Sequence, residues 1–146
     1  MKAKLMVLLM LMNFSIVSFA ADKIENLRVT SKGESLIFEP AELTVNPGKK
    51  VRLTFKNSAS VASGLQHNWV LVKTGKAEAV ASASMSAGLE KGWLHESSDI
   101  LAHTKLLGPG EEQAILFTVP KEKGDYPFIC TFPGHSMTMK GLLHVK

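Results

Sequence analysis

The chain has 146 residues, with 17 Lys and Arg against 13 Asp and Glu, and a formal net charge of +4. This length corresponds to one domain, because domains cluster at about 100–150 residues. A charge excess this small argues against nucleic-acid binding and against a polybasic membrane patch.

The first twenty residues have the pattern of a signal peptide: two lysines, then an almost uncharged run, then small residues. We expect cleavage after Ala20, with Ala21 as the alternative, which leaves a secreted, periplasmic domain at 21–146. A retained membrane anchor is the other interpretation, but the run is short for a span of about 20 residues, and Asn13 and Ser15 interrupt it. After cleavage the chain keeps all 13 acidic residues and 15 of the 17 basic ones, so its formal charge is +2.

Short apolar and β-branched runs recur along the rest of the chain and are separated by turn residues. In the clearest run, Val51, Leu53 and Phe55 alternate with polar residues and are expected to face inward. We expect strands at 26–30, 36–38, 43–45, 51–55, 68–72, 113–119, 124–132 and 141–146. Many short strands with turns between them indicate a β-sandwich or a β-barrel.

One segment differs from these runs. Residues 76–85 are rich in alanine and contain neither proline nor glycine, which favours a short helix that ends before Gly88. A single helix among strands is expected to lie on the outside of the sandwich. The predicted fold class is therefore all-β with one short external helix.

Cys130 is the only cysteine of the chain. In a secreted protein a lone cysteine can join two chains, remain an inert buried thiol or bind a metal. Composition does not distinguish these roles, but the neighbouring residues do.

A thiol, an imidazole and a thioether follow one another within ten residues, at Cys130, His135 and Met139. Copper that alternates between Cu(I) and Cu(II) prefers this mixture, because thiolate suits Cu(I), imidazole suits both states and a weak axial thioether tunes the potential. Met137 is the alternative axial residue.

A blue copper site also needs a second histidine. The candidates are His67, His95, His103 and His144. His67 is favoured because it opens the buried run 67–72, and a ligand at the start of a rigid strand can face a loop at the same end of a sandwich. The other three are expected to be surface or packing residues.

Three segments together resemble azurin and auracyanin, the azurin-like cupredoxins: 66–71, 102–108 and 130–139. The resemblance implies a cupredoxin-like Greek-key β-sandwich with one type 1 copper. The family's ligands correspond to His67, Cys130, His135 and Met139. Met139 is preferred over Met137 because the axial methionine of azurin is followed by Lys-Gly, as Met139 is here.

Two features depart from azurin. Azurin has glycine at the position of Gln66, whose backbone carbonyl corresponds to a weak additional copper contact. This chain also lacks the cysteines for azurin's N-terminal disulfide. Auracyanin matches the glutamine, so the resemblance is to the azurin-like group as a whole.

Residues beside the expected ligands have the chemistry to support them. Asn68 and Thr131 each follow a ligand, and a hydrogen bond between them would tie the two ligand segments together. The backbone N–H of Phe132 can point at the Cys130 sulfur and stabilise a thiolate there.

The resemblance implies an electron carrier that exchanges single electrons with redox proteins, and no enzymatic activity. His135 is the expected exit for the electron, and partners are expected to dock on the apolar residues around it, Leu65, Phe132, Pro133 and Met137. A copper carrier or storage protein is the alternative function, and a fragment of a copper oxidase is a third. No nucleic acid is expected as a partner, and no membrane span after signal cleavage.

Overall fold

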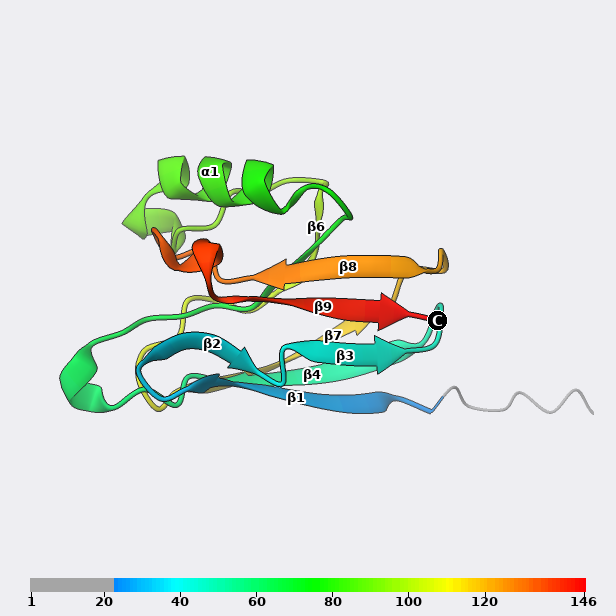
Figure 1. Cartoon of the computed structure of the whole chain (residues 1–146), viewed down its shortest axis with the longest axis horizontal. Coiled ribbons are helices and arrows are strands. Elements are labelled where there is room, and N and C mark those ends of the chain that lie inside the picture. The colour runs from blue at the N-terminus through cyan, green and yellow to red at the C-terminus, as the bar shows by residue number, and fades with distance from the viewer. Residues whose placement is uncertain (1–22) are drawn as a thin grey trace, which may run out of the picture.

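The computed structural model describes residues 23–146, which form two β-sheets and one α-helix (Figure 1). The predicted signal peptide lies outside these residues. The first sheet has the strand order β2 (Ser35–Glu39), β1 (Glu25–Lys32), β4 (Lys50–Lys56) and β7 (Glu112–Thr118). The second has the order β3 (Glu42–Val45), β9 (Lys140–Val145), β8 (Gly124–Ile129), β5 (Val70–Val72) and β6 (Ile100–His103).

The alternation predicted around residue 53 is confirmed in β4. Val51, Leu53 and Phe55 are fully buried, whereas Arg52 is exposed. Strand β4 pairs with β1 in parallel and with β7 antiparallel, so it lies in the middle of its sheet. Because successive side chains of a strand point to opposite faces, this sheet turns one apolar face toward the second sheet.

Aromatic side chains from both sheets form the core between them. The ring of Phe38 lies 5.6 Å from that of Phe55 and 5.3 Å from that of Phe128, centre to centre. Trp69 is fully buried and packs 5.4 Å from Phe128. These contacts join β2 and β4 to β8. Removing large apolar side chains such as these from water is the main favourable contribution to folding.

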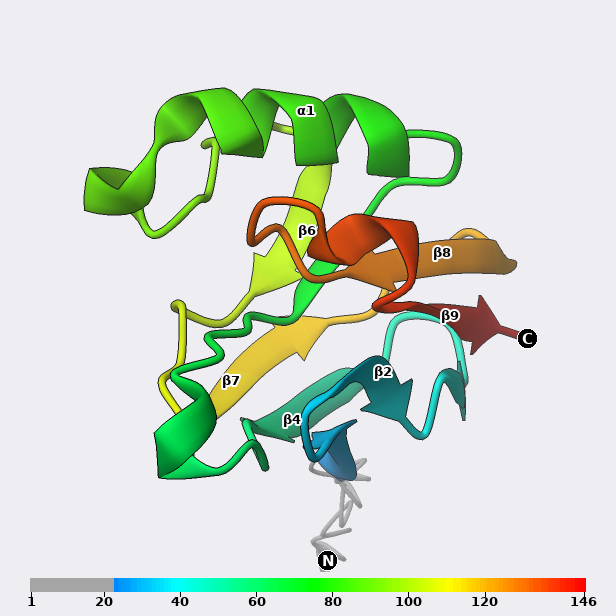
Figure 2. The ribbon, with the colours of Figure 1, turned by 60° about the vertical axis from the view of Figure 1, so that its left-hand side comes forward.

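Helix α1 (Ala77–Ala87) covers the outer face of the second sheet, as Figure 2 shows above β6 and β8. Val80 packs against Val70, Val72 and Ile129 in a small cluster separate from the main core. The predicted external helix is thus confirmed, and Gly88 follows its last residue. No helix within residues 23–146 has the length and apolar character needed to cross a membrane.

The sheets differ from the expected pattern in three places. Strand β5 begins at Val70, so Asn68 and Trp69 of the strand expected at 68–72 lie ahead of it. Strand β8 ends at Ile129, so residues 130–132 belong to the following loop, where Pro133 and Gly134 interrupt any extended ladder. Strand β6 was not predicted. It forms the edge of its sheet, and its residues show no alternation of burial, since the first three are half-buried and His103 is exposed.

Strand direction gathers three connections at one end of the sandwich. Strand β4 ends and β7 begins there, and β8 ends and β9 begins there as well, as their registers require. The segments at this end are 57–69, 104–111 and 130–139. Figure 1 shows the C-terminus at the opposite end of the molecule.

Candidate metal centre

Three side chains meet at the end of the sandwich where these segments gather. The Nδ1 atoms of His67 and His135 are 3.2 Å apart, and the Cys130 sulfur lies 3.9 Å and 3.6 Å from them respectively. These three residues, called the donor group below, are buried: His67 and Cys130 are fully covered, and His135 is 7% exposed. Their ligand atoms all lie within 4.8 Å of one another, which is close enough to share one metal ion.

The three donors come from different elements. His67 stands ahead of β5 in an isolated bridge with Leu107, where its N–H donates to the Leu107 carbonyl at 3.0 Å and its carbonyl accepts from the Leu107 N–H at 2.8 Å. Cys130 follows the last residue of β8, and His135 begins the short 3-10 helix η3 (His135–Met137). The sandwich therefore brings together residues 63 positions apart in the chain.

Met139 closes the loop that carries Cys130 and His135. Its N–H donates to the His135 carbonyl at 2.8 Å, and its carbonyl accepts from the Cys130 N–H at 3.0 Å. Its side chain is fully buried in the same core cluster as Cys130, whereas Met137 is 78% exposed. Between the two candidates for an axial thioether, burial therefore favours Met139.

The other histidines lie away from the donor group. His95 and His103 line one surface pocket, and His144 on β9 lies 2.7 Å from the Asp125 carboxylate on β8. Gln66 is half-buried and precedes His67 directly, and the metal contact of its carbonyl stays a prediction.

Burial sets the protonation of the donor group. It lowers the pKa of His67 to about 4, with a further lowering from the neighbouring His135, and it also lowers the pKa of His135. Both imidazoles are therefore neutral near pH 7, with lone pairs free for a metal. Burial raises the pKa of the Cys130 thiol to about 11, although the backbone N–H groups of Asn68 and Phe132 oppose this by hydrogen bonding to the sulfur. Such a thiol loses its proton when a metal cation binds to the sulfur.

The predicted tie between the two ligand segments is present. The side-chain Nδ2 of Asn68 donates to the Thr131 hydroxyl at 2.7 Å, and the Thr131 N–H donates to the side-chain Oδ1 of Asn68 at 2.8 Å. The predicted contact of the Phe132 N–H with the sulfur is present as well, and the N–H of Asn68 adds a second one. These bonds fix the thiol and the His67 segment relative to each other.

Trp93 is a supporting residue that the sequence analysis missed. The Thr131 hydroxyl donates to the Trp93 carbonyl at 2.6 Å, and the Trp93 ring packs edge-on 6.1 Å from Phe132, which lies 4.5 Å from His135. Trp93 has a positive φ of 53° and follows Gly92, so the only sequence signal was a large aromatic residue in a turn. It connects the segment after α1 to the ligand loop.

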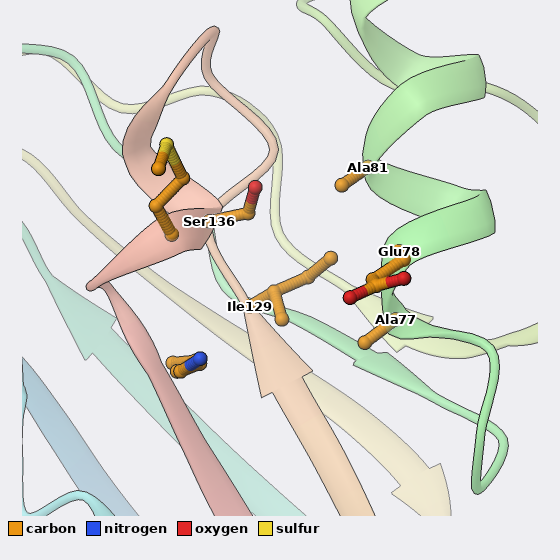
Figure 3. Close-up of a pocket in the computed structure, with 7 residues that line it drawn as sticks. Ala77, Glu78, Ala81, Ile129 and Ser136 are labelled. Carbon is orange, nitrogen blue, oxygen red and sulfur yellow. The ribbon is translucent and has the colours of Figure 1, made fainter.

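A pocket of about 180 Å³ lies beside this loop but does not reach the donors. Ala77, Glu78 and Ala81 of α1 line one side of it, and Ile129 and Ser136 line the other (Figure 3). None of the donor group is among its lining residues. The donors are therefore buried beneath the loop, out of contact with this pocket.

The donor set is chemically suited to copper. One thiol, two neutral imidazoles and a buried thioether nearby are the combination that blue copper sites use, whereas oxygen-rich sites suit magnesium or calcium. Together with Met139, the donor group is arranged as a type 1 copper site.

Comparisons with known proteins agree with this chemistry. Residues 25–146 match the family described as copper binding proteins of the plastocyanin/azurin family. Auracyanin-A of Chloroflexus aurantiacus is 43% identical over 123 residues, covering 82% of this chain and 74% of that protein. Azurin of Pseudomonas aeruginosa is 46% identical over 83 residues, covering 55% of this chain and 56% of that protein.

The solved structure of auracyanin A from Chloroflexus aurantiacus, described as a "blue" copper protein, superimposes with a TM-score of 0.77. It is 41% identical, and the match covers 85% of this chain and all of that one. The predicted Greek-key sandwich is thereby confirmed.

Proposed function

Because this chain belongs to the plastocyanin/azurin family of copper-binding proteins, we propose that it is a blue copper protein that carries single electrons between redox partners. The observation that carries the proposal is the convergence of His67, Cys130 and His135 within 4.8 Å in a buried site. Bound copper supplies the redox chemistry by alternating between Cu(I) and Cu(II). The chain supplies fixed ligands, exclusion of water and a route to the surface.

We assign the equatorial ligands to His67, Cys130 and His135 and the axial ligand to Met139. A buried, rigid ligand set suits electron transfer, because it changes little between the two oxidation states and leaves no strong position for a substrate. We therefore propose no enzymatic activity. A copper carrier or storage protein would instead hold Cu(I) in an exposed site, whereas two donors here are fully buried.

A visible spectrum of the purified protein with Cu(II) tests the proposal. An intense red-region charge-transfer band from thiolate to Cu(II) is expected, and a protein that binds only Cu(I) lacks it. A colourless protein that binds Cu(II) would contradict the proposal.

Met139→Leu tests the axial assignment. It should keep the colour, because the axial bond is weak, and raise the reduction potential measured by voltammetry. Met137→Leu is the matched control and should change neither. If Met137→Leu moved the potential while Met139→Leu did not, the axial assignment would be reversed.

The electron port is proposed to be His135, the one member of the donor group that reaches the surface, with 7% of its area exposed. The apolar residues Leu65, Phe132, Pro133 and Met137 would form the docking patch for redox partners around it. A small, mostly uncharged patch favours brief encounters, and a charge near +2 gives little long-range steering.

We further propose that the protein acts in the periplasm, with a signal peptide removed after Ala20 and a mature domain at 21–146. The support is the pattern of the first twenty residues. The intact mass of protein from a periplasmic fraction tests this, and a mass that includes the first twenty residues would contradict it.

A further inference from the structure

Asn57 is a buried amide that follows the last residue of β4 and uses every hydrogen-bonding position of its side chain. It is fully buried. Its Nδ2 donates to the carbonyls of Leu65 at 2.8 Å and Leu107 at 3.0 Å. Its Oδ1 accepts from the Ala59 N–H at 3.0 Å and the Ser31 hydroxyl at 3.2 Å. A side-chain amide can make two donor bonds and two principal acceptor bonds, so none is left over.

These partners fix the orientation of the amide. Carbonyl oxygens only accept, so Nδ2 must face Leu65 and Leu107, and the Ala59 N–H only donates, so Oδ1 must face Ala59. The backbone of Asn57 is fixed as well, because its N–H donates to the Glu111 carbonyl at 2.9 Å and its carbonyl accepts from the Gly110 N–H at 2.8 Å. The side chain is therefore a rigid cross-link between segments.

The two bonds from Nδ2 reach the chain just before His67 and the chain paired with His67. Leu65 stands two residues before His67 in the chain. Leu107 is the bridge partner of His67, and its carbonyl accepts both the His67 N–H and Asn57 Nδ2. Asn57 thus fixes the chain entering His67 and the chain paired with it, from one point on the scaffold.

We propose that Asn57 is a positioning residue for the copper site, which holds the His67 imidazole in its ligating position before metal binds. The proposal rests on the function proposed above, because it concerns a ligand of that site. The physical reason is that His67 belongs to no regular strand, and its own backbone groups are paired only in the isolated bridge with Leu107. Without the amide, the carbonyls of Leu65 and Leu107 each lose a hydrogen-bond donor, and the segment gains freedom to move.

A second consequence concerns Gln66, which lies between Leu65 and His67. Because the carbonyl before it and the N–H after it are both held through this network, Asn57 also limits the backbone rotation of Gln66. Asn57 therefore acts on the one backbone carbonyl that the family resemblance places near copper.

The test compares Asn57→Asp with Ser31→Ala. Asn57→Asp keeps the shape and the acceptor atom but turns an oxygen toward the two carbonyls. Ser31→Ala removes a bond to the same side chain on the side away from His67. Both should lower stability, and only Asn57→Asp should free the ligand segment.

In the metal-free protein we expect Asn57→Asp to speed amide hydrogen exchange at His67 and Leu107 by about tenfold or more relative to exchange at Leu71 in β5, and Ser31→Ala to leave that ratio unchanged. In the copper-loaded protein, release of copper to a chelator should speed up by a similar factor for Asn57→Asp alone. Equal ratios and equal release rates for the two variants would overturn the proposal.

If Asn57→Asp does not fold, hydrogen exchange in the metal-free unsubstituted protein tests the proposal instead. Its His67 and Leu107 amides should then exchange only through global unfolding, at the rate of Leu71. Faster local opening at these two amides would show that the network does not hold His67 in the absence of metal. Loss of the blue band in the unsubstituted protein would refute the proposed function instead, and these exchange measurements do not depend on that band.

Discussion

The two parts of the metal centre are held in place in different ways. The 130–139 loop is shaped by hydrogen bonds within its own backbone. The His135 N–H donates to the Phe132 carbonyl at 3.0 Å, and the backbone of Met139 is hydrogen-bonded to those of Cys130 and His135. His67 instead depends on Leu107, which is 40 positions further along the chain, and through it on Asn57. One part is a local motif, and the other exists only when the sandwich has formed.

This difference explains how a small domain builds a rigid site. The 130–139 loop can bring Cys130, His135 and Met139 together. By itself it cannot exclude water from the site or hold His67 against these residues. The remote segment closes the site and is in turn tied to the loop through Asn68 and Thr131. The following changes test each part separately.

The largest effect is expected from Cys130→Ala, which removes the thiol from the local part. The blue colour should be lost completely, because the charge-transfer band originates in the thiolate. The fold should remain, because a small apolar side chain replaces a buried thiol and the backbone bonds of the loop are unaffected. The visible spectrum with Cu(II) and the far-ultraviolet circular dichroism measure the two expectations. A blue Cys130→Ala protein would disprove the assignment of the thiolate.

Gly141→Ala tests how the local loop is joined to the scaffold. Gly141 lies in β9, two residues after Met139, where an added Cβ would overlap the Ala41 carbonyl and the Phe128 ring. Neither can move easily, since one is backbone and the other belongs to the aromatic core, so we expect a loss of about 3 kcal/mol or more in the free energy of unfolding.

The matched control is Gly108→Ala, where a Cβ would meet only the Glu111 carboxylate at an ordinary 3.6 Å. Urea unfolding of both variants measures the difference. Equal stabilities would mean that the exit of the loop tolerates movement and that the loop is less dependent on the scaffold than this contact indicates.

The local part of the site could be predicted from the sequence, and the remote part only incompletely. Cys130, His135 and Met139 are visible because their donors fall within ten residues, and α1 is visible because its alanines form one uninterrupted run. His67 was chosen by its position at a strand start. Leu107, Asn57 and Trp93 have no comparable signal, because their roles are backbone or amide contacts made in the folded chain. An asparagine after a strand usually indicates a turn.

Thr131→Val tests the connection between the two parts. Valine has the same shape as threonine but no hydroxyl, so the buried Asn68 amide loses its acceptor and the Trp93 carbonyl loses its donor. We expect a loss of about 1–3 kcal/mol in the free energy of unfolding, together with a change in the visible spectrum. Thr44→Val, at an exposed position of β3, should leave both unchanged. If Thr131→Val altered stability but not the spectrum, the tie would support the fold without fixing the ligands.

The smallest effect is expected where the local part meets solvent. Met137 projects from η3 and is 78% exposed, two residues after His135, so a charge there should hinder the close approach of a partner without touching the donors. Met137→Glu should slow electron self-exchange about tenfold, which is about 1.4 kcal/mol in the docking step, and leave the spectrum unchanged.

Leu116→Glu is the matched control, because Leu116 is 59% exposed on β7, a strand of the other sheet. It adds the same charge to the molecule but not to the patch around His135. Self-exchange rates measured by NMR line broadening in mixtures of the two oxidation states separate the local effect from the effect of net charge. If both variants slowed exchange equally, net charge alone would explain the result, and the docking patch would have to be sought elsewhere on the surface.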